Sequence, residues 1–315
     1  MGMVNIDPIS TESISRAVDI LQAGQLVAFP TETVYGLGGD ATNNRAVAEI
    51  FATKNRPEFN PLIIHVANKT AAEKIGQFTR IAHTLADQFW PGALTLVLQK
   101  TSNCTIPLLA SGGLDSLAIR VPGHDFARYL IEQTGHPIAA PSANTSGRLS
   151  PTTAQHVADQ LSDKIPLILD GGPCTIGVES TVLDLTGDTP TLLRPGGISV
   201  EIIEKSLSIE ISTSAHKGGT FKSPGMLTSH YAPARPLRLN AHKAKPGEAL
   251  LGFGPNDMNA NLNLSESSDL TEAAANLFAY LHQLDVAPYR AIAVMPLPEK
   301  ELGRAINDRL RRAAA

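Results

Sequence analysis

The chain has 315 residues, of which 43% are hydrophobic, so it can bury a substantial core and is long enough for two domains. Its formal net charge of −4 provides no overall attraction for nucleic acid, and two cysteines are too few for a disulfide framework or a structural zinc site. No apolar run approaches the roughly 20 residues of a membrane span, so we expect a cytoplasmic protein that does not enter a membrane.

Helix and strand patterns alternate from the start of the chain. Apolar spacing predicts a helix around residues 14–21 and a buried strand over 26–29. Residues 30–40 follow as a turn-rich segment with many hydroxyls and glycines, at a strand's carboxyl end, where open α/β sheets usually bind ligands. A helix over 44–53 then places Lys54 and Arg56 at its C-terminal exit. These two cations suit a phosphate ligand, or else a solvated helix end that complements the helix dipole.

The next elements add a histidine and an arginine to apolar strands. Strands are expected over 62–66, 94–98, 117–121 and 137–140, and helices over 81–89 and around 126–130. His65 lies in the first of these strands and is either a core residue or part of a pocket, with no second metal ligand at a neighbouring position. Arg120 lies in the third and faces either solvent or a ligand carboxylate, because burial without a partner is too costly.

Ser150-Pro151 has the pattern of an N-cap followed by proline at the first helical position. The exposed amides of such a helix start would make a phosphate site with Ser150 at its lip. Strands are expected again over 167–169, 181–185 and 192–194, and neutral polar groups at Ser142 and Ser180 suit a zwitterion or a ribose, or ordinary turns.

The pattern changes from about residue 206. Residues 212–231 are polar, rich in Gly, Ser and Thr and without periodicity, which predicts an interdomain linker. A small α/β unit follows, with strands over 249–253 and 291–295 and helices over 272–284 and 302–310. We expect the arginines of the last helix, Arg304, Arg309, Arg311 and Arg312, to form a solvated face rather than an RNA site.

Familiar nucleotide and hydrolase signatures are missing. The sequence contains no P-loop, no complete dinucleotide fingerprint, no H-E-x-x-H and no G-x-S-x-G. A nucleotide bound here would need a different cradle.

Taken together, the motifs resemble the YrdC-like family in its long two-domain form, the threonylcarbamoyl-AMP synthases. The matching runs are 30–38, 54–57, 60–65, 90–92, 118–122, 140–147, 150–152, 177–181, 193–197 and 229–233, with a tail at 295–298 and 303–309. The resemblance implies a twisted open mixed α/β sheet with flanking helices and a concave pocket over 1–207. It further implies a linker over 208–235 and a small Rossmann-like α/β domain over 236–315.

The resemblance also implies a reaction, in which L-threonine, bicarbonate or CO2, and ATP give L-threonylcarbamoyladenylate and pyrophosphate. The product would pass to a separate transferase that forms N6-threonylcarbamoyladenosine in tRNA. Similarity assigns threonine binding to Thr33, His65, Arg120, Ala140 and Ser180. It assigns ATP binding to Arg56, Asn60, Ser116, Ser142, Ser150, Arg194 and Tyr231, with Lys54 and Arg56 as the catalytic cations. Mg²⁺ is expected on the nucleotide, without direct protein ligands.

Physical reasoning agrees with these assignments, because both reactants are anionic and the site must gather cations. We expect the linker to fold back as a lid with Tyr231 against the nucleotide. Two alternatives remain: a carbamoyl-adenylate-forming maturation enzyme, and a non-catalytic module that binds double-stranded RNA. Weak RNA binding is also compatible with the enzyme.

Overall fold

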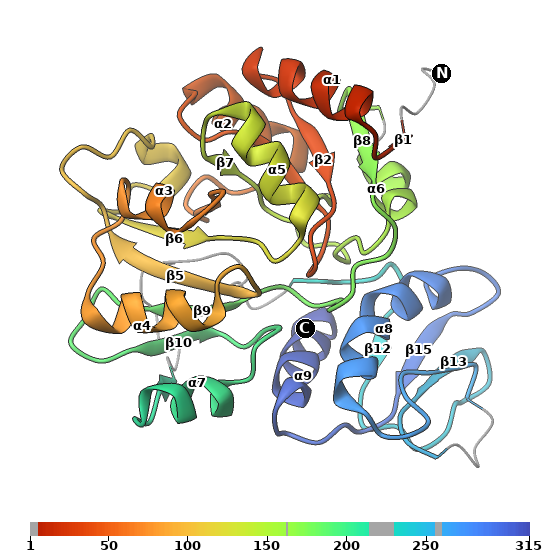
Figure 1. The fold of residues 1–315 in the computed structure, drawn as a ribbon. Helices are drawn as coiled ribbons and strands as arrows, with labels where there is room; N and C mark the ends of the chain where they lie inside the picture. Colours follow the sequence, from red (N-terminus) through yellow and green to blue (C-terminus); the bar gives the residue numbers. More distant parts are fainter. Residues whose placement is uncertain (1–5, 162, 214–229, 256–259) are drawn as a thin grey trace.

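A computed structural model describes residues 6–161, 163–213, 230–255 and 260–315 of the chain. It has a large α/β unit, coloured red to green in Figure 1, and a small blue α/β unit beside it. The helices are α1 (Thr11–Gln22), α2 (Asn44–Lys54), α3 (Lys69–Glu73), α4 (Arg80–Phe89), α5 (Asp125–Thr134), α6 (Ala154–Leu161), α7 (Val200–Leu207), α8 (Leu270–Leu284) and α9 (Leu302–Ala313), with a 3-10 turn at Leu108–Ser111. The strands are β1 (Ile6–Pro8), β2 (Val27–Phe29), β3 (Gly36–Asp40), β4 (Ile63–His65), β5 (Leu94–Gln99), β6 (Ser116–Arg120), β7 (Ile138–Ala139), β8 (Leu167–Asp170), β9 (Thr181–Asp184), β10 (Thr191–Arg194), β11 (Ser212–Thr213), β12 (Leu237–Arg238), β13 (Glu248–Gly252), β14 (Leu262–Asn263) and β15 (Ala291–Val294).

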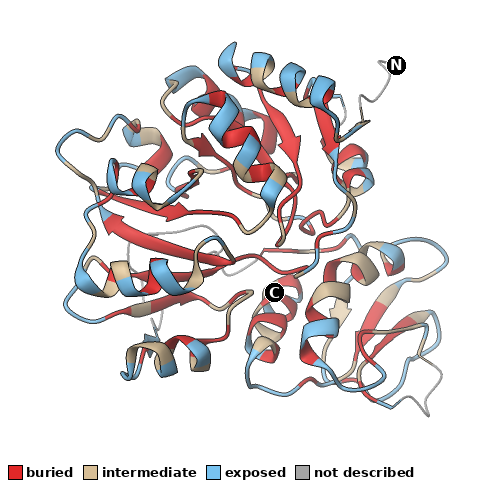
Figure 2. Ribbon diagram, viewed as in Figure 1, coloured by how far each residue is buried: buried red, intermediate tan, exposed pale blue. Residues whose placement is uncertain are grey.

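One mixed sheet organises the large unit. Its strand order is β1-β8-β2-β3-β7-β4-β6-β5-β9-β10-β11, with parallel pairs such as β4 and β6 and antiparallel pairs such as β2 and β3. The central strands are buried, while the flanking helices bury one face and expose the other (Figure 2). The predicted fold class, a mixed sheet with flanking helices, is therefore confirmed.

Residues 30–40 were predicted to be rich in turns, but the last five of them form strand β3. A Cβ on Gly38 would lie 2.6 Å from a ring carbon of Phe29 and 2.9 Å from a methyl of Ile138. Glycine therefore lets β3 approach the neighbouring strands closely, and the composition that indicated a turn serves packing instead.

The small unit contains a four-stranded parallel sheet in the order β12-β15-β13-β14, with α8 and α9 packed on one another. The predicted small α/β unit is present. Strands β12 and β14 were not predicted, because two residues are too few for a periodic pattern.

The two units share a hydrophobic cluster. Val34, Leu149 and Val178 of the large unit pack in one cluster with Leu277 and Phe278 of α8. Helix α9 lies where the units meet, as its position beside the C label in Figure 1 shows. The contact is thus a continuous core rather than a loose junction.

Part of the predicted linker belongs to the sheet. Strand β11 pairs in parallel with β10. Helix α7, which precedes β11 in the chain and was not predicted, packs against α4. The stretch from 214 to 229, which holds most of the expected lid, lies outside the described residues. No helix in the described ranges has the length and apolar character needed to cross a membrane.

Candidate active site

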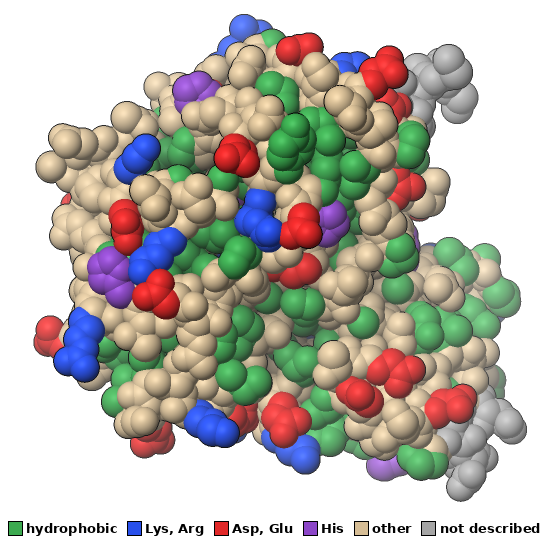
Figure 3. Space-filling model, in the orientation of Figure 1, with side chains coloured by type: hydrophobic (Ala, Val, Ile, Leu, Met, Phe, Trp, Pro, Cys, Tyr) green, Lys and Arg blue, Asp and Glu red, His purple; other side chains and the backbone are tan. Residues whose placement is uncertain are grey.

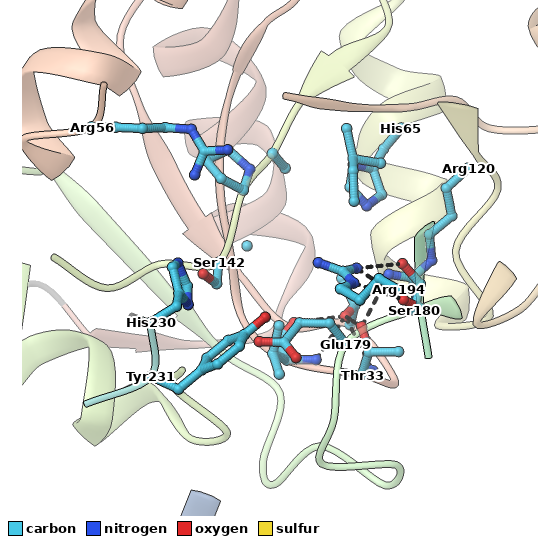
Figure 4. A pocket seen from close by; sticks show the side chains of 16 residues that line it. Thr33, Arg56, His65, Arg120, Ser142, Glu179, Ser180, Arg194, His230 and Tyr231 are labelled. Atoms are coloured by element: carbon cyan, nitrogen blue, oxygen red, sulfur yellow. Dashed lines mark hydrogen bonds between the residues drawn. The ribbon is translucent and has the colours of Figure 1, made fainter. Parts of the chain in front are cut away.

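A cavity lies in the large unit beside His230 and Tyr231, where the described chain resumes. Its wall includes Thr33, Arg56, His65, Arg120, Ala140, Ser142, Ser180, Arg194 and Tyr231, all of which the sequence analysis selected. Figure 4 labels all of these side chains except Ala140 and shows them reaching the cavity from separate elements. Residues far apart in the sequence therefore meet in one place.

Arg56 enters the cavity just after α2. Asn55 ends the helix in the left-handed conformation (φ 51°), which turns the chain and directs Arg56 inward. The guanidinium donates from Nε to the carbonyl of Asn60 (3.0 Å) and from Nη2 to the carbonyl of Pro61 (2.8 Å). Burial and the nearby Arg194 lower the pKa of Arg56 to about 9, so the site disfavours this cation unless an anion joins it.

Lys54 lies behind the cavity wall rather than in it. Its ammonium is buried and donates to the backbone carbonyl of Ser142 (2.5 Å) and to the carbonyl of Asn144. Burial and the neighbouring Arg56 hold the pKa of Lys54 well below its usual range. These bonds fix the 142–144 loop, so Lys54 supports the wall that carries Ser142.

Arg120, at the end of β6, donates three hydrogen bonds to neighbouring groups. It donates from Nε to the carbonyl of Gly92 (3.1 Å), from Nη1 to Thr33 Oγ1 (3.0 Å) and from Nη2 to Glu32 Oε1 (2.5 Å). Burial alone would raise the pKa of Glu32, but Arg120 lowers it below its ordinary value. The sequence left open whether Arg120 faces solvent or a ligand carboxylate. In the structure Arg120 is buried, forms an ion pair with Glu32 and lines the cavity.

His65 ends β4 next to Arg120 and lines the cavity. Burial and the charge of Arg120 lower the pKa of His65 to about 3, so the ring is neutral near pH 7. Its Nδ1 is buried and has no hydrogen-bond partner within the part of the chain that the structure describes. A neutral imidazole with a free ring nitrogen is a suitable partner for a polar ligand.

Ser180 and Arg194 also line the cavity and contact one another. Arg194 donates from Nε (3.1 Å) and Nη2 (2.9 Å) to the carbonyl of Ser180, and from Nη2 to its Oγ (3.1 Å). The Ser180 hydroxyl also lies 2.7 Å from Thr95 Oγ1. Strands β9 and β10, which are antiparallel neighbours, bring the two residues together.

Tyr231 and His230 complete the wall where the chain re-enters the described part. Tyr231 is 1% exposed, has a positive φ of 65° and packs against Phe278 of the small unit, with ring centres 5.6 Å apart. Burial, chiefly, lowers the pKa of His230 to about 3. Tyr231 was predicted to lie at the nucleotide pocket, and its position in the cavity wall is compatible with that prediction.

Besides Lys54, three further selected residues do not line the cavity. Asn60 and Ser116 are buried, and Asn60 contributes its backbone carbonyl to Arg56 rather than its side chain. Ser150 is buried and donates to Glu179 Oε1 (2.5 Å). The predicted N-cap at Ser150 is wrong, because α6 begins only at Ala154 and the Thr153 hydroxyl accepts from the amide of His156 instead.

Sequence reasoning missed Glu32, Glu179 and His230. Glu179 lines the cavity and pairs with Arg309 of α9, whose side chain is fully buried. The expectation that Arg309 belongs to a solvated face is therefore wrong, although Arg311 is exposed as predicted. The available signal was that Glu179 adjoins the selected Ser180. Nothing in the sequence indicated its partner, because Arg309 lies 130 residues further along the chain.

The described residues contain no group of three or more His, Cys, Asp or Glu side chains that could hold a metal ion. On the face drawn in Figure 3, basic and acidic side chains are interspersed. The cations of the cavity are themselves buried, so they are poorly placed to meet a nucleic-acid backbone.

Two family models match the chain in succession. The model of the Sua5, YciO and YrdC proteins, described as "Telomere recombination", matches residues 19–196. The model described as "Threonylcarbamoyl-AMP synthase, C-terminal domain" matches residues 198–315.

Similar proteins cover nearly the whole chain. The threonylcarbamoyl-AMP synthase of Pyrococcus abyssi is 41% identical over 334 residues, covering 99% of this chain and 97% of the relative. That of Bacillus subtilis is 40% identical over 330 residues, covering 98% and 95%. The crystal structure of P. abyssi Sua5 complexed with L-threonine matches with a TM-score of 0.89 at 40% identity, covering 99% of this chain and 97% of that one. Escherichia coli YciO, at 24% identity and a TM-score of 0.56, shares the fold over 62% of this chain.

Proposed function

The chain belongs to the threonylcarbamoyl-AMP synthases of the Sua5, YciO and YrdC family, and we propose that its buried cavity is where threonine and ATP react. The enzyme is a nucleotidyltransferase that makes L-threonylcarbamoyladenylate. We propose that it works in the cytoplasm and hands this product to a separate transferase for tRNA modification.

The observation that carries the proposal is Arg56. It lines the cavity, is 7% exposed, and bonds to two carbonyls but to no carboxylate among the described residues. A buried cation without an anionic partner is costly, and a bound phosphate would remove that cost. Guanidinium groups match phosphoryl oxygens through their planar fork, so a nucleotide is the fitting ligand.

We assign the two sides of the cavity to the two substrates. Arg56, Ser142, Arg194 and Tyr231 line the nucleotide side, and Thr33, His65, Arg120, Ala140 and Ser180 line the threonine side. Lys54, Asn60, Ser116 and Ser150 then act one layer behind, by fixing backbone that the ligands contact. This division keeps the hydroxyl-rich groups around threonine and two guanidinium groups near the phosphates.

The residues act by position and charge, without a covalent nucleophile. The threonine amine adds to CO2, formed from bicarbonate with loss of water overall, and releases a proton to give a carbamate. A carbamate oxygen then attacks the α-phosphorus, and pyrophosphate leaves with the electrons of the broken P–O bond. Arg56 and Arg194 lower the repulsion between these two anions, which is the main catalytic requirement in such transfers.

Arg120 and His65 hold the amino acid. Two N–H groups of the Arg120 guanidinium remain beyond the three bonds described above, and they suit a carboxylate. His65 is neutral, so it offers a hydrogen bond without adding charge beside the amine. Ser180 offers a hydroxyl to the threonine side chain, and such pairing disfavours valine because it leaves buried polar groups unpaired.

We propose that Mg²⁺ arrives on the nucleotide. Glu32 and Glu179, the carboxylates next to the cavity, are each bound by an arginine, which leaves them poorly suited to ligate a metal. When bound to the phosphates, Mg²⁺ would neutralise part of their charge.

The test is a mass spectrometric search for the adenylate product. Incubation with ATP, Mg²⁺, ¹³C-bicarbonate and threonine should yield labelled threonylcarbamoyladenylate and an equal amount of pyrophosphate. Omitting threonine, or replacing it with valine, should abolish both. The proposal is refuted if pyrophosphate is released at the same rate without threonine. It is also refuted if the protein binds RNA with a steep salt dependence and consumes no ATP.

A further inference from the structure

Arg309 crosses from the small unit into the wall of the catalytic cavity. It lies on α9, is 0% exposed, and is the largest fully buried side chain in the described part of the protein. Its Nε donates to Glu179 Oε2 (2.8 Å), and its Nη1 donates to the carbonyl of Pro195 (2.8 Å) and to Asp308 Oδ2 (2.8 Å). One side chain from α9 therefore holds two separate segments of the large unit.

Both of those segments carry cavity residues. Glu179 lines the cavity and precedes Ser180, and Pro195 follows Arg194, so both of these bonds reach the wall or the residue next to it. The segments also touch directly, because a Cβ on Gly196 would lie 2.3 Å from the carbonyl oxygen of Glu179. A displacement of either segment would be transmitted to the other.

Helix α9 also supports the end of the linker. The guanidinium carbon of Arg309 lies 5.2 Å from the centre of the Tyr231 ring. One turn further along α9, the carbonyl of Arg312 accepts from the amide of His230 (3.1 Å). Tyr231 is thus positioned from behind by the same helix that holds Glu179.

The large unit is shaped for this contact. Gly177 has a φ of +74°, and a Cβ there would lie 2.4 Å from the carbonyl oxygen of Ala274 on α8. Glycine allows the loop that carries Glu179 to press against the small unit with its backbone.

Glu179 depends on Arg309 electrostatically. Its other oxygen accepts from Ser150 Oγ (2.5 Å), and the carboxylate is buried. Burial would raise the pKa of Glu179, but Arg309 and Arg194 lower it to about 2. Removing Arg309 would leave a buried carboxylate without its closest cation, and the loop would move toward water to relieve this.

We propose that Arg309 is a positioning residue for catalysis, through which the small unit completes the active site. Arg309 does not line the cavity. It holds Glu179 and Tyr231, which do line it, and Pro195, which follows the wall residue Arg194. The inference rests on the proposed function, and it gives the small unit a direct part in that function.

The experiment compares full-length variants. Arg309→Gln removes the charge, Arg309→Lys keeps the charge but not the fork, and Arg311→Gln is the matched control. Arg311 lies on the same helix but is exposed, and it pairs with Glu299 at the surface. Pyrophosphate release is measured over ranges of threonine and ATP, and the folded fraction is followed by circular dichroism.

We expect Arg309→Gln to lower kcat/KM about a hundredfold, the loss typical of a misplacement near 1 Å, with raised Michaelis constants. Arg309→Lys should lie between this variant and the wild type, and Arg311→Gln should match the wild type. A variant that is merely partly unfolded would show a lower apparent kcat and unchanged Michaelis constants. If Arg309→Gln is folded and has wild-type Michaelis constants, the inference is overturned. If the glutamine variant does not fold, wild-type Michaelis constants in Arg309→Lys would overturn it instead.

A double-mutant cycle with Glu179→Gln adds a second readout. If Arg309 acts through Glu179, the double variant should lose less than the sum of the two single losses. Additive losses would refute that route. An inactive wild type would instead refute the proposed function, so the two failures are distinguishable.

Discussion

Replacing Arg120 with alanine should destabilise the protein by stranding Glu32. The Arg120 side chain is 4% exposed and that of Glu32 is 12% exposed, so the pair is shielded from water. Breaking a buried ion pair by removing one partner costs about 3–5 kcal/mol. Because whole domains are stable by only about 5–15 kcal/mol, the variant should still fold but unfold at clearly lower denaturant.

The pH dependence of the loss identifies its cause. In the wild type, Arg120 holds the pKa of Glu32 below 4.5, so this pair adds stability above that pH and loses it as pH falls through the folded value. Without Arg120, burial raises the pKa of Glu32, and protonation then relieves the stranded charge. The stability deficit of Arg120→Ala should therefore shrink between pH 7 and pH 5.

Urea denaturation followed by circular dichroism at both pH values measures this deficit, with Glu32→Gln/Arg120→Ala as the control. The double variant should recover part of the loss, because it buries no carboxylate. Threonine KM should rise in both variants far more than ATP KM. A deficit below about 1 kcal/mol, or one independent of pH, would show that Glu32 is not stranded.

Three further predictions concern other parts of the site. Arg56→Ala should reduce pyrophosphate release at least about a hundredfold, since charge stabilisation of this kind is worth that much, and near-normal turnover would remove Arg56 from the mechanism. The pKa of His65 falls from 6.5 to about 3 on folding, so protonation of this residue opposes folding below pH 6.5. The wild type should therefore lose stability as the pH falls from 7 to 5, and His65→Gln should reduce that loss by up to about 1.4 kcal/mol per pH unit. Urea denaturation at pH 7 and pH 5 measures the difference. Gly196→Ala should cost about 1–3 kcal/mol or more, because its Cβ would meet backbone atoms at 2.3 Å, whereas Gly187→Ala, with no atom within 4 Å, should cost little; equal melting temperatures would contradict this packing argument.

The order of the main elements could be predicted from the sequence, because apolar periodicity is local. Strands β2, β5, β6 and β13 and helices α2, α4 and α8 lie within a few residues of their predicted bounds. Gly36–Asp40 was included in a turn-rich segment because glycine is common both in turns and in close-packed strands. Only the contact with the neighbouring Phe29 shows that these residues form a strand.

The site was predictable to the extent that it follows family motifs. Those motifs mark Arg56, His65 and Arg194, which do meet in the cavity. They do not distinguish a side chain in the wall from one that supports it, as Lys54 and Asn60 illustrate. Arg309 could not be located, since an arginine-rich amphipathic helix has the same pattern whether one arginine faces solvent or a partner 130 residues away.

The sheet joins distant parts of the chain at its outer edge. In the pairing of β1 with β8, Ile6 lies opposite Ile168, and the closing of such non-local pairs is slow because chain entropy is lost before contacts form. Because the cavity wall draws on residues from Thr31 to Tyr231, refolding enzyme should regain helical signal well before it regains turnover. The rate at which turnover recovers after dilution from denaturant would then report the last step, in which distant segments pack around the cavity, rather than the early collapse of the chain.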